Sequence, residues 1–129
     1  MEEKVAFFWF RRDLRLEDNA GLFRALTSGL PVVPVFIFDS VILDKLEDKQ
    51  DARVQFIHQQ LVSLQEAFVK MGSSLRIFHG NPVEVWASIF ENWSVSEIYT
   101  NRDYEKYALE RDEIIKEKAN QKGIAFYTE

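Results

Sequence analysis

Short apolar runs alternate along this chain with segments whose apolar residues have helical spacing. This alternation limits the possible fold more than any other feature of the sequence. Val5–Phe10 (VAFFWF) is continuously apolar, and Val32–Phe38 is a second such run that contains Pro34. Shorter runs follow at 75–78, 97–100 and 124–127. An unbroken apolar run is typical of a strand that is covered on both faces, as in parallel sheets. Pro34 would weaken a central strand unless it lies near the strand start or at a bulge.

Four stretches between these runs have the spacing of helices. In the clearest, Asp51–Met71, apolar residues return every three or four positions and polar residues occupy the rest of the helical wheel. Gly72 follows at once, and glycine suits the left-handed residue after a helix end. The other helices are expected at 19–27, 82–91 and 104–122, and Asn81–Pro82 has the pattern of an N-cap followed by a first-turn proline.

The order βαβαβαβαβ predicts an α/β fold, a Rossmann-like five-stranded parallel sheet with right-handed crossovers and helices on both faces. The 129 residues suffice for one such domain, so residues 1–129 are expected to form a single unit. One connection, 39–51, exceeds the roughly two to six residues usual in such units. It carries five acidic residues and two lysines.

Composition excludes several classes of function. The chain has no cysteine, which excludes a disulfide scaffold, a thiolate metal site and a thiol nucleophile, and only two histidines, which argues against a zinc centre. Its net charge of −5 does not favour non-specific nucleic-acid binding, which depends on Lys and Arg. It shows no secretory signal and no apolar run of membrane-spanning length, so we expect a cytoplasmic protein.

In a doubly wound sheet, ligands bind beyond the carboxyl ends of the strands, near the point where strand order reverses. This rule selects four loops, which begin at Arg11, Asp39, His79 and Asn101. The first, Arg11–Asn19, holds three arginines and three acidic residues, which either grip an anionic ligand or pair among themselves. The chain has no glycine-rich phosphate loop of either common type and no G-x-S-x-G elbow, so dinucleotide, kinase and hydrolase chemistry is unsupported.

The loop that begins at Asn101 mixes carboxylates with phenols. Asp103 and Glu105 beside Tyr104 and Tyr107 would suit a flat heteroaromatic ligand with hydrogen-bonding edges. The alternative is a solvated helix start, because acidic side chains favour the positive end of the helix dipole.

Three other features have simpler interpretations. Asp39 can pair with Arg53 across the long connection, or it can merely cap the turn after its strand. His79 is expected in a loop without a special role. The three tryptophans, Trp9, Trp86 and Trp93, are expected in the core rather than in an electron-transfer chain.

Trp9–Asn19, WFRRDLRLEDN, resembles the amino-terminal signature of the DNA photolyase/cryptochrome family. The similarity continues in order through PVFIFD, the helix end at 61–72, GNP, NRDYEKY and Arg111–Asp112, so it spans essentially the whole chain. The resemblance implies an α/β domain that can hold a light-harvesting antenna chromophore. In the family, a larger helical domain binds FAD and the damaged DNA.

The resemblance also implies a role in light-driven chemistry. In photolyases, excited reduced FAD donates an electron to a cyclobutane pyrimidine dimer, whereas cryptochromes use the same scaffold for light signalling. The FAD pocket, the dimer-binding residues and the family's tryptophan path lie outside the part matched here, so we expect no catalytic residue and no repair by the chain alone. The implied partners are a small chromophore, the helical FAD domain and, through the parent protein only, damaged DNA; no membrane partner is implied.

The identity of the antenna follows from the same resemblance. Folate-binding members carry an Asn-Glu pair where this chain has Tyr107 and Ala108, which favours 8-hydroxy-5-deazaflavin or FMN over folate. By position, residues 36–39 would line one side, two residues would come from the long helix, and two carboxylates would accept hydrogen bonds from the ring. Residues 11–13 would contact the ligand or brace the domain interface. The residues assigned in this way are Arg11, Arg12, Asp13, Phe36, Ile37, Phe38, Asp39, Arg53, Ile57, Asp103 and Glu105.

Three alternatives remain open at this stage. The domain can belong to a signalling cryptochrome, or it can be a stand-alone nucleotide-binding protein of the same architecture. It can also brace a helical partner domain and bind nothing.

Overall fold

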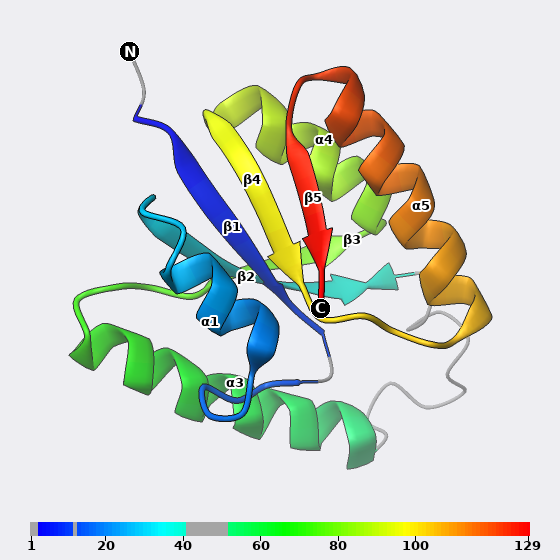
Figure 1. The fold of residues 1–129 in the computed structure, drawn as a ribbon. Coiled ribbons are helices and arrows are strands. Elements are labelled where there is room, and N and C mark those ends of the chain that lie inside the picture. Colours follow the sequence, from blue (N-terminus) through cyan, green and yellow to red (C-terminus); the bar gives the residue numbers. More distant parts are fainter. Residues whose placement is uncertain (1–2, 12, 41–51) are drawn as a thin grey trace.

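The computed structural model describes residues 3–11, 13–40 and 52–129, with side chains from residue 55 onward in the third range. Strands and helices alternate along these residues (Figure 1). The strands are β1 (Val5–Phe10), β2 (Val32–Asp39), β3 (Arg76–Gly80), β4 (Val95–Thr100) and β5 (Ala125–Thr128). The helices are α1 (Ala20–Leu26), α3 (Ala52–Lys70), α4 (Pro82–Asn92) and α5 (Lys106–Gln121).

The five strands form one parallel sheet in the order β3-β2-β1-β4-β5, which confirms the predicted architecture. The chain passes from β1 outward to β2 and β3, and then returns to the other side of β1 for β4 and β5. Strand order therefore reverses between β1 and β4, and the carboxyl ends of these two strands flank the crevice where this fold binds ligands.

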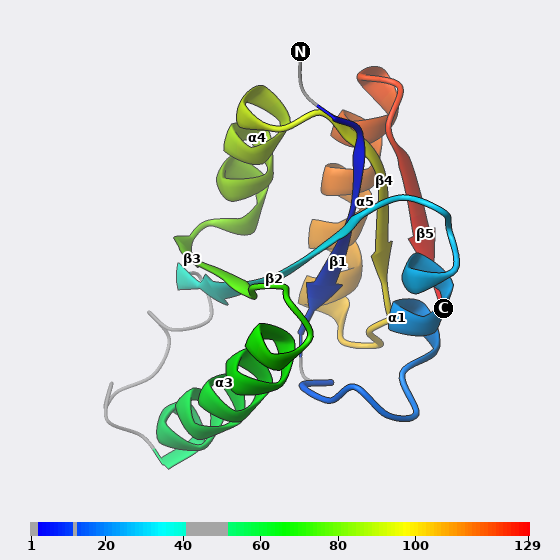
Figure 2. The same ribbon diagram turned by 90° about the vertical axis from the view of Figure 1, so that its left-hand side faces the viewer.

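Helices cover both faces of the sheet (Figure 2), and an apolar layer lies on each face. Successive side chains of a strand point to opposite faces, so β1 supplies Phe7 and Trp9 to one layer and Phe8 and Phe10 to the other. The first layer includes the inner faces of α4 and α5, and the second includes those of α1 and α3. This double coverage explains why all six residues of β1 are buried.

Pro34 lies inside β2, which has a neighbour on each side, yet it does not interrupt the sheet. Its partner in β1 is Phe8, and the pairing with β3 begins only at Val35. The proline therefore precedes the part of β2 that is paired on both sides, where a missing N–H would remove a ladder bond.

The predicted N-cap at Asn81 is confirmed, Asn19 caps α1 instead of beginning it, and several predicted boundaries differ from the structure by one or two residues. The Asn19 side chain accepts from the backbone N–H of Leu22 at 3.0 Å, and that of Asn81 accepts from Val83 at 2.9 Å. α5 begins at Lys106 rather than two residues earlier, because the Asp103 carboxylate accepts from the N–H groups of Tyr104 and Glu105 and holds them in a turn.

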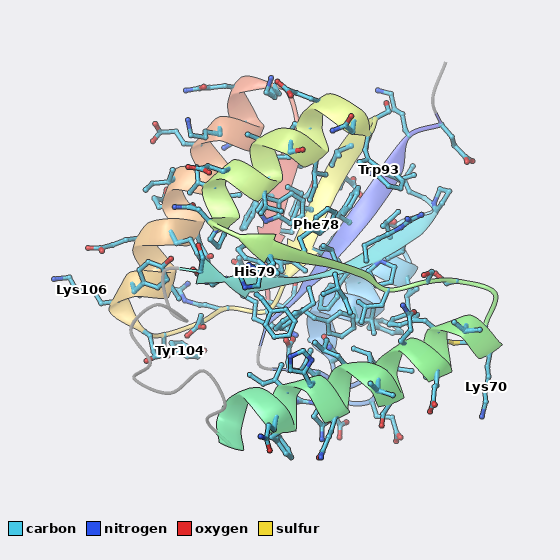
Figure 3. The ribbon with its side chains drawn as sticks, turned by 180° about the vertical axis from the view of Figure 1, so that it is seen from behind. Lys70, Phe78, His79, Trp93, Tyr104 and Lys106 are labelled. Carbon is cyan, nitrogen blue, oxygen red and sulfur yellow. The ribbon has the colours of Figure 1, made fainter. Side chains whose placement is uncertain are left out.

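His79, predicted in a loop, lies in β3, because the pairing between β2 and β3 continues to the pair Asp39 and Gly80. Phe78 and His79 are therefore neighbours on the same edge strand (Figure 3). Among the described helices, none is long and apolar enough to cross a bilayer.

Candidate functional site

A cavity of about 310 Å³ opens where the strand order reverses, at the carboxyl ends of β1 and β4. We call it the edge cavity. Its walls come from the loop after β1 and the loop after β4, and the lining residues are Arg11, Asp13, Asn101, Arg102, Asp103, Tyr104 and Glu105. The Tyr104 side chain is 81% exposed and stands at the rim, before the start of α5 (Figure 3). A polar wall with one accessible aromatic ring suits a flat ligand that has hydrogen-bonding edges.

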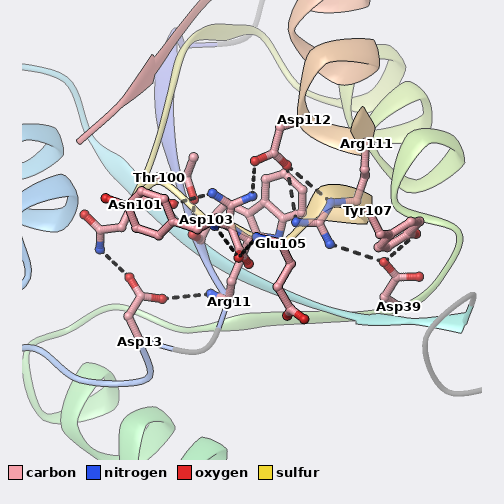
Figure 4. A network of polar contacts seen from close by, with 12 residues as sticks. Arg11, Asp13, Asp39, Thr100, Asn101, Asp103, Glu105, Tyr107, Arg111 and Asp112 are labelled. Carbon is pink, nitrogen blue, oxygen red and sulfur yellow. Dashed lines mark hydrogen bonds and ion pairs between the residues drawn. The ribbon is translucent and has the colours of Figure 1, made fainter. Parts of the chain in front are cut away.

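The Asn101 side chain contacts Asp13 (Figure 4) and also joins the two walls of the edge cavity to α1. Its oxygen accepts from the Gly21 backbone N–H at 2.8 Å. Its amide nitrogen donates to the side-chain oxygen of Asn19 at 2.7 Å and to the Asp13 carboxylate. One amide therefore fixes both loops and the first turn of α1 relative to each other.

Arg11 is held by two acceptors that lie far from it in the sequence. Its guanidinium donates to the Asp112 carboxylate on α5 and to the backbone oxygen of Asn101. The side chains of Arg11 and Asp112 are only 9% and 11% exposed. A guanidinium can serve two acceptors at once because its donors form a planar fork.

A second arginine continues this contact toward β2. Arg111 donates to Asp112 and to Asp39, both at 3.3 Å, and the Tyr107 hydroxyl donates to Asp39 at 2.9 Å. Burial, followed by the hydrogen bond to Asp39 and the charge of that carboxylate, raises the pKa of Tyr107 to about 12.

Both guanidinium groups also lie over the Trp9 ring, at 4.8 Å for Arg11 and 4.9 Å for Arg111. The indole therefore supports the buried charges through cation–π contacts.

Among the described residues of the first loop, the Arg11 side chain makes its hydrogen bonds with other elements, whereas Arg15 and Asp13 form hydrogen bonds within the loop. Among the described residues, Arg15 donates to the carbonyl oxygens of Glu17 and Asp18, and Asp13 accepts from the Arg11 backbone N–H. The Arg11 side chain instead reaches α5 and the loop after β4.

The structure brings some of the predicted site residues together and separates others. Arg11, Asp13, Asp103 and Glu105 all line the edge cavity. Asp39 does not line it, but it is linked to Arg11 through Arg111 and Asp112. Arg12 and the side chain of Arg53 lie outside the described residues.

The apolar residues assigned from β2 divide between the two faces of the sheet. Ile37 is buried in the layer with α4 and α5. Phe36, Phe38 and Ile57 belong to the layer with α1 and α3. These side chains therefore cannot all form one wall.

Four residues of the site's framework are absent from the set that the resemblance assigned, although Tyr107 was named beside the two carboxylates of its loop. Asn101, Tyr107, Arg111 and Asp112 all belong to the motifs NRDYEKY and Arg111–Asp112, so the resemblance was the signal that marked them. His79, which was expected to have no special role, and His58 have ring centroids 6.2 and 5.0 Å from that of Phe38.

Comparisons with known proteins show the family and the fold of this chain. The family model described as DNA photolyase matches residues 6–129. The chain is 34% identical over 105 residues to a deoxyribodipyrimidine photo-lyase of Synechococcus sp., covering 81% of this chain and 22% of that protein. It is 31% identical over 119 residues to cryptochrome-1 of Gallus gallus, covering 92% of this chain and 19% of that protein.

A solved archaeal photolyase from Sulfolobus tokodaii, described with two FAD molecules and the implication of a novel light-harvesting cofactor, is 37% identical. It superposes with a TM-score of 0.85 over 96% of this chain and 28% of its own. The chain thus spans about a fifth of the two curated relatives and 28% of this structure.

Proposed function

Because the chain belongs to the DNA photolyase family, we propose that it is the antenna-chromophore-binding α/β domain of a photolyase or a cryptochrome. Its task is to hold a flat light-absorbing molecule at the carboxyl edge of the sheet, in a fixed place relative to FAD. In this proposal FAD lies in a helical domain of the parent protein, which also carries light-driven repair of pyrimidine dimers or light signalling. Damaged DNA is a partner of that parent protein and not of residues 1–129.

The edge cavity is the observation that carries this proposal. Its volume of about 310 Å³ is at the lower end of the range of small-molecule sites, and it lies where the strand order reverses. The similar Sulfolobus tokodaii photolyase is described with two FAD molecules and the implication of a novel light-harvesting cofactor, which favours a flavin-type chromophore.

The lining residues have chemically distinct roles in this proposal. Asp103 and Glu105 accept hydrogen bonds from N–H or O–H groups at the edge of the ring system, and Arg11 donates to a carbonyl oxygen. The exposed ring of Tyr104 stacks on the face of the chromophore. FMN and 8-hydroxy-5-deazaflavin offer such edges, and we propose them in preference to folate.

The framework around the cavity suits an antenna. Energy transfer depends on the orientation of the chromophore, so its site must be held by rigid elements rather than by free loops. Asn101 and Arg11 tie the two walls to α1 and α5, and their partners are themselves anchored on buried helices and strands.

The proposal is tested by titrating the purified chain with FMN, with 8-hydroxy-5-deazaflavin and with a reduced folate, following chromophore fluorescence. We expect saturable binding of FMN or the deazaflavin and at least about tenfold weaker binding of folate, a difference of about 1.4 kcal/mol. Saturation by none of the three would overturn the proposal and favour a bracing role. Thermal stabilisation by ATP would favour a stand-alone nucleotide-binding protein.

The placement of the ligand is tested by Asp103→Ala combined with Glu105→Ala. Hydrogen bonds to charged groups contribute about 1.5 kcal/mol or more each, so the dissociation constant should rise at least about tenfold. Asp103→Asn keeps a side-chain oxygen that can accept from the N–H groups of Tyr104 and Glu105, but it removes the charge. Its affinity therefore shows the effect of the lost charge while the turn at 103–105 is kept. Glu110→Ala with Glu113→Ala removes the same charge from exposed positions of α5 and should leave affinity unchanged. Equal affinity in both double variants would place the ligand elsewhere.

A further inference from the structure

A series of buried and half-buried polar side chains runs from the end of β1 across α5 to the end of β2 (Figure 4). Its members, in the order in which they contact one another, are Arg11, Asp112, Arg111, Asp39 and Tyr107. We call this series the ion row. Its four charged side chains are between 7% and 11% exposed, and their formal charges cancel.

Stability alone is a weak explanation for the ion row. Removing two carboxylates and two guanidinium groups from water is costly, and well-packed apolar side chains often replace buried ion pairs without loss. The better-attested use of such groups is to specify one arrangement of the segments that carry them. The question is therefore which segments the ion row holds in place.

Arg11 connects the ion row to the loop that lines the edge cavity. Its guanidinium donates to Asp112 and also to the backbone oxygen of Asn101, the first residue of that loop. Asp103 then folds the loop on itself by accepting from the N–H groups of Tyr104 and Glu105. The place of the cavity carboxylates therefore depends on Arg11, and the orientation of Arg11 depends on Asp112.

We propose that Asp112 is a positioning residue of the ligand-binding site. It does not line the edge cavity, but it holds Arg11 against the start of the loop 101–105 and thereby sets the affinity for the chromophore. Through Arg111 it also links this loop to Asp39 at the end of β2. The inference rests on the proposed chromophore site for its effect on affinity, but its effect on the loop exists without a ligand.

The test is Asp112→Asn, which removes the charge with little change in size. Two measurements are made under conditions in which the variant is fully folded. The first is amide hydrogen exchange of residues 102–105 without ligand, and the second is titration with FMN. The N–H groups of Arg102, Tyr104 and Glu105 have acceptors in the structure, so their exchange reports the loop directly. We expect exchange about tenfold faster and an FMN dissociation constant about tenfold higher.

Glu113→Gln, which removes a charge from the next and exposed residue of α5, is the matched control and should change neither value. If Asp112→Asn lowers the melting temperature but leaves loop exchange or FMN affinity as in the control, the role is structural and the inference is overturned. If the wild-type chain binds no FMN, the proposed function fails for this ligand, while loop exchange still supports or overturns the positioning of the loop.

Asp112→Asn leaves a net positive charge in a buried place and can unfold the chain. The double variant Arg11→Met with Asp112→Asn avoids this, because Arg111 and Asp39 remain as a balanced pair. Arg11 lines the cavity, so its loss would change FMN affinity directly. Only amide hydrogen exchange of the loop is therefore measured for this variant. We expect the same acceleration at 102–105, and wild-type exchange there would overturn the inference.

Discussion

At the scale of single residues, the cavity depends on one close approach. Asn101 reaches the backbone N–H of Gly21, which lies in the first turn of α1. A Cβ atom on Gly21 would lie 2.7 Å from the Asn101 side-chain oxygen and 2.9 Å from the Phe8 ring. Position 21 therefore requires glycine because any side chain would collide with these neighbours. The lack of a side chain lets α1, β1 and the loop after β4 approach one another closely.

Gly21→Ala should consequently destabilise the chain, although alanine is otherwise the better helix former. The neighbours are a buried ring and a backbone carbon, so the added methyl displaces Asn101, at a cost of about 1–3 kcal/mol. Chemical denaturation followed by circular dichroism measures this loss. Ala20→Ser, at the exposed neighbouring position, is the control and should change stability by less than about 0.5 kcal/mol. A Gly21→Ala variant as stable as wild type would show that Asn101 is not tightly held.

Contacts between residues close together in the sequence were predictable, whereas contacts between distant residues were not. The capping role of Asn81 was predictable because its partner, Val83, is two positions away. The contact of Asn101 with Asp13 spans 88 positions, and nothing local in either segment indicates that the two side chains meet. Such pairings become visible only once the sheet brings the two loops together.

At the scale of elements, α4 is the helix whose start is most clearly encoded. Asn81→Ala removes the side-chain oxygen that accepts from Val83 and should lower the free energy of unfolding by about 1 kcal/mol. Asn81→Ser keeps a capping oxygen and should recover most of the loss. Denaturant titration of both variants checks this. Because α4 does not line the edge cavity, FMN affinity should stay at the wild-type value in both. Equal destabilisation by alanine and serine would contradict the capping role.

Element boundaries were predictable because their signals are local. Apolar runs, glycines after helices and the Asn–Pro pair placed every strand and helix that the structure describes within a few residues. The misses have physical causes: the Asp103 turn delays α5, and pairing with β2 draws His79 into β3. Both depend on hydrogen bonds that a pattern of apolar residues does not contain.

At the scale of the whole molecule, the sheet determines which predicted residues can act together. The loops after β1 and β4 were both expected to hold ligand residues, and the strand order places them side by side. The run of β2 residues was expected to form one wall, but alternation sends Ile37 to the opposite face from Phe36 and Phe38. The resemblance indicated segments that line the edge cavity, whereas the ion row, which joins them, required the packed fold.

The packed fold also predicts how stability responds to alkali. Burial is the main cause that raises the pKa of Tyr107, and likewise of Tyr99, from 10.0 to about 12. The native state therefore keeps these protons at a pH where the unfolded chain has lost them. The contribution of these two tyrosines to stability is complete below about pH 10 and is lost as the pH rises toward about 12, because ionisation then favours the unfolded state.

The urea midpoint of the wild-type chain should therefore fall across this pH window. The midpoint of Tyr107→Phe should fall less steeply, although it should be lower at neutral pH because Asp39 loses a hydrogen-bond donor. Tyr104→Phe, at a ring that is 81% exposed, should keep the wild-type slope. Equal slopes in wild type and Tyr107→Phe would mean that this hydroxyl ionises as readily in the folded chain as in the unfolded one.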